Sequence, residues 1–144
     1  MKFSTRGRYA LRLMVDLAQQ DPGENITLRD ISVRQGISVK YLEQIVTPLS
    51  RAGLLKSIRG AQGGYRLARP AESYTAGEIL RAIEGSLAPV ACLDDAVNQC
   101  PRCDSCATVA FWEGLSRVIG EYVDSVRLDQ LAQNDCPGKT KNKP

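Results

Sequence analysis

The sequence predicts a mainly α-helical fold with one small β-hairpin and one long helix in its second half. Two observations support this fold class: an amphipathic helix followed by a glycine-rich hairpin over residues 38–67, and an apolar stripe repeated over residues 107–127. We expect a DNA-binding domain over 1–85, a cysteine-rich segment over 86–106, a dimerisation helix with a C-terminal helix over 107–136, and a disordered tail over 137–144.

The helix near residue 40 has one apolar face and one polar face. Its apolar residues recur at the spacing of a single helix face, at Leu42, Ile45, Val46 and Leu49. The opposite face carries Lys40, Glu43, Gln44 and Thr47. Lysine and glutamine suit the base edges of the major groove, and the width of that groove admits an α-helix. We therefore expect this face to contact DNA, although a merely solvated face would show the same spacing.

Two alternating stretches, 54–58 and 65–67, predict a β-hairpin directly after this helix. The turn between them contains Gly60, Gly63 and Gly64, and glycine adopts backbone angles that are closed to other residues. Arg59 makes the turn basic. A helix followed by a basic hairpin is the outline of a winged helix–turn–helix domain, whereas the glycines alone would fit any tight hairpin.

Two further helices are expected ahead of this one. The first covers residues 5–20, with Arg6, Arg8 and Arg12 off its apolar stripe, where they could meet phosphates or be solvated. The second begins after a Thr27 cap and ends at Gly36, and a Ser38 cap then begins the third, so that the two short helices form a helix–turn–helix unit. Pro48 within the third helix predicts a kink or a lost hydrogen bond.

The charge is distributed unevenly although the net charge is only +3. Residues 1–70 hold 12 Lys and Arg against 5 Asp and Glu, and residues 71–144 hold 7 against 11. A basic first half favours a polyanionic partner such as DNA. The chain has neither the roughly 18 consecutive apolar residues of a membrane-spanning helix nor the apolar centre of a signal peptide, so we expect a soluble, cytoplasmic protein without a membrane partner.

After the hairpin, Thr75 and Glu78 have the spacing of a capping box for a helix that ends at Gly85. The apolar stripe of the next helix, from about 107 to 127, would be about 30 Å long at about 1.5 Å per residue. Such a stripe is too long for the small domain to cover, which predicts a two-fold homodimer, with packing inside one chain as the alternative. Leu128 and Leu131 are expected to cap the dimer helix.

The chain contains no histidine and five cysteines. Ser-His-Asp and Cys-His nucleophilic sites and histidine-bearing zinc sites are therefore excluded. Four cysteines follow the pattern C-x7-C-x2-C-x2-C at Cys92, Cys100, Cys103 and Cys106. Cys136 is distant and could be a fourth or a spare thiol. Clustered thiols of this kind favour an iron–sulfur cluster, with zinc, a thiol–disulfide switch or inert thiols as alternatives that spacing does not separate.

The opening MKFSTRGRYA, the helix SVKYLEQ, the hairpin SIRGAQGGYRL and the segment TAGEIL resemble the bacterial regulator family that contains the iron–sulfur cluster regulator IscR and the cysteine-metabolism repressor CymR. The resemblance covers 1–131 and implies a homodimeric winged-helix transcription regulator, a repressor rather than an enzyme, that binds an imperfect palindrome in double-stranded DNA. It also implies control of genes for cluster assembly or cysteine supply. A cluster-free regulator with a protein partner, a zinc-binding regulator and an electron carrier are the alternatives.

The resemblance also implies roles for individual residues. Lys40, Glu43 and Gln44 match the family's base-reading face, and Arg59 matches a wing residue that enters the minor groove. The expected DNA-binding set is completed by Tyr41, Gly60 and Arg8.

The family's three ligand cysteines match Cys92, Cys100 and Cys106. The family's further ligands are a histidine, at the position of Val109 here, or a carboxylate, at the position of Arg8 here, so Cys103 is the candidate fourth ligand. By resemblance the expected cofactor is a [2Fe–2S] cluster, with [4Fe–4S] as the alternative.

Overall fold

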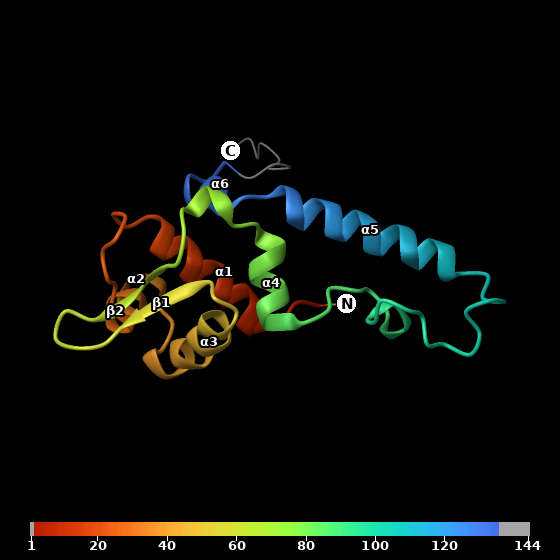
Figure 1. The fold of residues 1–144 in the computed structure, drawn as a ribbon, viewed down its shortest axis with the longest axis horizontal. Helices are drawn as coiled ribbons and strands as arrows, with labels where there is room; N and C mark the ends of the chain where they lie inside the picture. The colour runs from red at the N-terminus through yellow and green to blue at the C-terminus, as the bar shows by residue number, and fades with distance from the viewer. Residues whose placement is uncertain (1, 136–144) are drawn as a thin grey trace.

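The computed structural model describes residues 2–135 and shows a helical domain from which one long helix extends (Figure 1). The elements are α1 (Thr5–Ala18), α2 (Leu28–Gln35), α3 (Val39–Arg51), β1 (Leu55–Ile58), β2 (Gly64–Leu67), the 3₁₀ turn η1 (Ala71–Ser73), α4 (Ala76–Glu84), the 3₁₀ turn η2 (Ala91–Leu93), α5 (Val109–Ser125) and α6 (Leu128–Ala132). The predicted fold class is confirmed. Cys136 and the expected tail over 137–144 lie outside the described residues.

The helix boundaries follow from the residues that cap them. The hydroxyls of Ser4, Thr27 and Ser38 each accept a hydrogen bond from a backbone N–H in the first turn of α1, α2 and α3. Gly36 ends α2 in the left-handed conformation with φ 66°. Helix α3 continues through Pro48, and the carbonyl of Gln44 accordingly receives no backbone hydrogen bond from that position.

Strands β1 and β2 pair antiparallel, with Leu55 opposite Leu67 and Ile58 opposite Gly64. A short extended piece before α2 lies along the outer side of β2. Ile26 N donates to Tyr65 O at 2.8 Å, and Tyr65 N donates to Ile26 O at 2.7 Å. A Cβ on Gly64 would lie 2.5 Å from Ile26 O, so this close approach requires glycine.

The core joins residues from both ends of the chain. It is built from apolar side chains of α1, α2, α3, β1 and α4, and Leu128 at the start of α6 is completely buried among them. The backbone of the same stretch is held as well, because Leu128 N donates to Tyr74 O and Ala76 N donates to Val126 O. The expectation that Leu128 caps the dimer helix is wrong, because α5 runs back toward the domain (Figure 1) and the chain then places this side chain in the domain core.

Helix α5 begins far from the domain, runs toward it and contacts α4 near its own C-terminal end (Figure 1). Val123 is the one buried residue of this helix among those described. Phe111 is 64% exposed and Val118 is 57% exposed. Much of the predicted apolar stripe is therefore not covered by other parts of the same chain. None of the described helices has the length and apolarity to span a membrane.

Candidate functional site

The polar face of α3 is open to solvent. Lys40, Glu43 and Gln44 are exposed, whereas Leu42 and Ile45 on the opposite face are completely buried. Tyr41 differs from the other predicted DNA-binding residues, because its half-buried ring packs edge-on against Tyr9 with 5.5 Å between the ring centroids. The predicted base-reading side chains therefore share one accessible helix face, and Tyr41 also helps to hold α3 on α1.

Two of the three arginines of α1 brace the helix–turn–helix. Arg6 Nη2 donates to Gln44 O at 3.5 Å, the carbonyl that Pro48 leaves without its helical donor. Arg12 donates to the side chain of Gln35, with Nε 3.2 Å from Oε1, and also to the Gln35 carbonyl. Arg8 is exposed, and its side chain has no hydrogen bond or ion pair within the described part of the chain.

The tip of the hairpin presents Arg59 and Gly60 to solvent. Gly60 has φ 109°, and its carbonyl accepts from Gly63 N at 3.0 Å to close the turn. Asn25 Nδ2 donates to Gln62 O at 3.2 Å and ties the tip to the segment before α2. The wing is thus anchored while its arginine stays accessible.

A buried carboxylate joins α1 to α2. Asp16 is 1% exposed and accepts two hydrogen bonds from Arg34, at 2.7 Å and 3.0 Å, and one from Gln35 Nε2 at 3.0 Å. The hydrogen bonds to Asp16 raise the pKa of the Arg34 guanidinium. Sequence reasoning missed this pair, although an acid between the apolar positions Leu13 and Leu17 was a signal for it.

The four clustered cysteines line one cavity at the start of α5. Its volume is about 120 Å³, and its wall is formed by Val90, Cys92, Asn98, Cys100, Cys103, Cys106, Thr108, Val109 and Trp112. All four thiols are free. The contact with Thr108 lowers the pKa of the Cys106 thiol, whereas partial burial, followed by the nearby Asp104 carboxylate, raises the pKa of Cys103.

This set of donors fits a soft metal centre or an iron–sulfur cluster, because four thiols face one cavity that contains no histidine. The thiols are not already arranged as ligands, since among residues 2–135 no group of three or more metal-binding side chains could hold a metal ion as it stands. The structure therefore brings the predicted ligands to one place without setting their coordination geometry.

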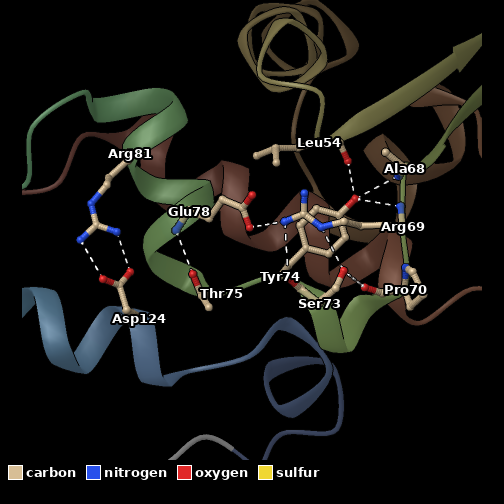
Figure 2. A network of polar contacts seen from close by, with 10 residues as sticks. All are labelled: Leu54, Ala68, Arg69, Pro70, Ser73, Tyr74, Thr75, Glu78, Arg81 and Asp124. Carbon is tan, nitrogen blue, oxygen red and sulfur yellow. Dashed lines mark hydrogen bonds and ion pairs between the residues drawn. The ribbon is translucent and has the colours of Figure 1, made fainter.

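A polar network fixes the hairpin to α4 (Figure 2). The buried Tyr74 hydroxyl donates to Leu54 O at 2.7 Å and accepts from Ala68 N at 2.9 Å. Burial raises the pKa of this phenol. The guanidinium of Arg69 lies 4.2 Å from the Tyr74 ring centre and forms an ion pair with Glu78. Glu78 thus pairs with Arg69, and the N-cap of α4 rests on the bond from Glu78 N to Thr75 Oγ1 at 3.1 Å.

The family model named Rrf2, described as "Iron-dependent Transcriptional regulator", matches residues 3–134. The chain belongs to the Rrf2 family. It is 41% identical to the transcriptional regulator IscR of Cereibacter sphaeroides over 95% of this chain and 92% of that protein. The solved structure of CymR, the global cysteine regulator of B. subtilis, superposes with a TM-score of 0.75 and 36% identity over 93% of this chain and 98% of that one. The structure of T. potens IscR superposes with a TM-score of 0.74 and 38% identity over 98% of this chain and 93% of that one.

These similarities decide the class of function. The Rrf2 relatives are transcription regulators, and members of this class bind DNA. The prediction of a transcription regulator, rather than an enzyme, is therefore confirmed.

Proposed function

We propose that this Rrf2 protein is a homodimeric repressor in which an iron–sulfur cluster bound to segment 86–106 changes DNA affinity or site choice. The observation that carries this proposal is the single cavity lined by Cys92, Cys100, Cys103 and Cys106, located between the cysteine-rich segment and the first turn of α5. The cysteine-rich segment connects α4 to α5, so a change in its conformation would affect the positions of both helices.

DNA recognition is assigned to α3 and the wing. Lys40 and Gln44 would read base edges, and Glu43 would select against some bases. Arg59 and Gly60 at the wing tip would enter the minor groove, and Arg8 would contact a phosphate. The exposure of these residues and the positive charge of residues 1–70 support the assignment. Two copies related by a two-fold axis would require an imperfect palindrome.

The partner assigned to α5 is a second copy of the chain. The 17 residues of the helix span about 25 Å, and Phe111 and Val118 on it are exposed. A contiguous apolar surface of this kind is typical of an interface between subunits. An equivalent helix offers a surface of matching length and chemistry, as a two-fold interface requires.

Cys92, Cys100 and Cys106 would hold the cluster, with Cys103 as the fourth ligand. Val109 also lines the cavity and has no atom able to ligate iron. When bound, the cluster supplies a group whose charge and integrity vary with iron supply and oxidants. The residues around it order the segment, and the ordered segment sets the spacing and tilt of the two α3 helices. By family resemblance we favour [2Fe–2S] over [4Fe–4S], and genes for cluster assembly or cysteine supply as targets.

A cluster-free regulator that responds to a protein partner is the second candidate. It is favoured by the thiol arrangement, which holds no preformed metal site among the described residues, and by the similarity to CymR. In this candidate α3 and the wing bind DNA in the same way, but the cysteines bind no metal ion or cluster.

The deciding measurement is iron and acid-labile sulfide per chain, with the visible spectrum, on protein purified without oxygen. About two irons support [2Fe–2S], and about four support [4Fe–4S] with Cys103 as a ligand. The single tryptophan, Trp112, lines the cysteine cavity, so its fluorescence should be quenched as the cluster binds. Colourless protein that stays iron-free after anaerobic reconstitution would favour the cluster-free or zinc-binding regulator.

A further inference from the structure

Glu84 connects the end of α4 to the first turn of α1. It is the last residue of α4 and stands directly before Gly85 and the cysteine-rich segment. Its Oε1 accepts hydrogen bonds from Ser4 N at 2.9 Å and from Ser4 Oγ at 2.5 Å. Ser4 is also the N-cap of α1, and its Oγ accepts from Gly7 N at 3.0 Å. A carboxylate is therefore fixed at the positive end of the α1 dipole.

The other contacts of α1 lead to the DNA-reading helix. Arg6, two residues after Ser4 in the first turn of α1, donates to the Gln44 carbonyl within α3. Gln44 is also a proposed base-reading residue, so α1 contacts the backbone of the very residue that faces DNA. A movement of the first turn of α1 would thus alter the support of α3.

We propose that Glu84 is a positioning residue that transmits the conformation of the cysteine-rich segment to α3 through Ser4 and Arg6. The inference rests on the proposed function, because it requires a cluster that orders that segment. Gly85 has φ 76°, so the chain turns sharply between Glu84 and the segment. A hollow of about 220 Å³, lined by Lys2, Phe3, Glu84 and residues 86–89, separates the N-terminal residues from the start of the segment. The hollow leaves room for this start to move relative to α1.

Gly7 provides a way to break the contact without removing either partner. A Cβ on Gly7 would lie 2.2 Å from Glu84 Oε1 and 3.1 Å from Glu84 Cδ. Gly7→Ala would therefore push the end of the flexible Glu84 side chain away from Ser4. Alanine also favours a helix over glycine, so the same substitution does not weaken α1. If Glu84 has a merely structural role, Gly7→Ala should hardly change the effect of the cluster on DNA affinity. If Glu84 transmits the signal, Gly7→Ala should largely abolish this effect.

The test measures the dissociation constants of cluster-loaded and cluster-free full-length protein, at one salt concentration, for a labelled duplex selected from a random pool by the wild-type chain. The ratio of the two constants reports the coupling, and about 5- to 150-fold is typical of such systems. We expect Gly7→Ala and Glu84→Ala to bring the ratio close to one, with iron content unchanged. Glu72→Ala, which removes an exposed carboxylate on η1, is the matched control and should keep the wild-type ratio.

The outcomes separate this inference from the proposed function. A wild-type chain that binds no cluster, or whose cluster-loaded and cluster-free forms select the same duplexes and bind them equally tightly, overturns both. A wild-type ratio that survives in both Gly7→Ala and Glu84→Ala overturns the role of Glu84 alone. If Glu84→Ala does not fold, Gly7→Ala decides the matter. Thr27→Ala, which removes the N-cap of α2 without touching Glu84, should weaken both forms and leave their ratio intact.

Discussion

The guanidinium of Arg81 on α4 meets the carboxylate of Asp124 on α5 through two hydrogen bonds (Figure 2), with Nη1–Oδ1 at 2.5 Å and Nη2–Oδ2 at 3.1 Å. Gly77 lies so close that a Cβ there would be 2.1 Å from Asp124 Oδ1. The pair therefore sits at a tight crossing of the two helices and fixes the direction in which α5 approaches the domain.

Asp124→Ala should change this direction more than it changes stability. The side chains of Arg81 and Asp124 are 42% and 49% exposed, so water screens the pair, and we expect a loss of about 0–1 kcal/mol of unfolding free energy in urea. Binding to a duplex with two half-sites should weaken more than binding to one half-site. Glu121→Ala, which breaks the exposed pair with Arg117 inside α5, is the control. Equal weakening on both duplexes would contradict the assigned role.

Gln44→Ala should weaken binding to the cognate duplex by about 1–3 kcal/mol, because one base-edge contact is lost. Anisotropy titrations at fixed salt measure the change, and binding to a random duplex should stay the same. Gln133→Ala removes an exposed amide far from α3 and should bind like the wild type. Unchanged specific binding by Gln44→Ala would show that the wrong helix face is assigned to DNA.

Arg8 and Arg12 form a matched pair on one helix. Within residues 2–135 the side chain of Arg8 has no hydrogen bond or ion pair, whereas Arg12 is bonded to Gln35. Arg8→Ala should weaken binding to all sequences alike and lower the salt slope by about 0.9, as expected for one lost phosphate contact. Arg12→Ala should instead lower the midpoint of thermal unfolding and leave the salt slope unchanged. If instead Arg12→Ala lowered the salt slope and Arg8→Ala lowered the midpoint of thermal unfolding, Arg12 would be the phosphate contact and Arg8 the structural residue.

The parts of the fold that could be predicted are those encoded within a few neighbouring residues. Ser38 and Gly36 bound their helices through groups less than one turn away, so their pattern is visible in the sequence. The contact of Leu128 with the core and the contact of Arg6 with Gln44 join distant segments. No periodicity encodes such pairings, because they depend on how α5 returns the chain to the domain and on which helix packs beside α1.

The same distinction applies to the site. The spacing of the cysteines predicted that they act together, and the structure places all four around one cavity. Trp112 joins that cavity from the first turn of α5, and its place there could not be foreseen from spacing alone. Ligand geometry is a property of the ordered segment with its bound group and cannot be read from the sequence.

Cys103→Ser should lower cluster stability without preventing assembly, because Cys92, Cys100 and Cys106 remain. We expect full iron content after anaerobic reconstitution but faster loss of visible absorbance and faster recovery of Trp112 fluorescence in air. Cys100→Ser should retain little iron, since it removes one of the three ligands implied by family resemblance. Ser105→Ala, within the same segment, is the control. Wild-type decay in Cys103→Ser would mean that the fourth ligand comes from elsewhere.

Val118→Asp should produce a monomer. Val118 is 57% exposed on α5, so the charge costs the isolated chain little, whereas burying it between two helices would cost several kcal/mol. Sedimentation at micromolar concentration measures the change in oligomeric state. The variant should also bind a duplex with two half-sites only slightly more tightly than a duplex with one. Arg117→Ala changes the neighbouring exposed position and should remain dimeric. A wild-type chain that is already monomeric would remove α5 as the interface, and a dimeric Val118→Asp would move the interface to another face of the molecule.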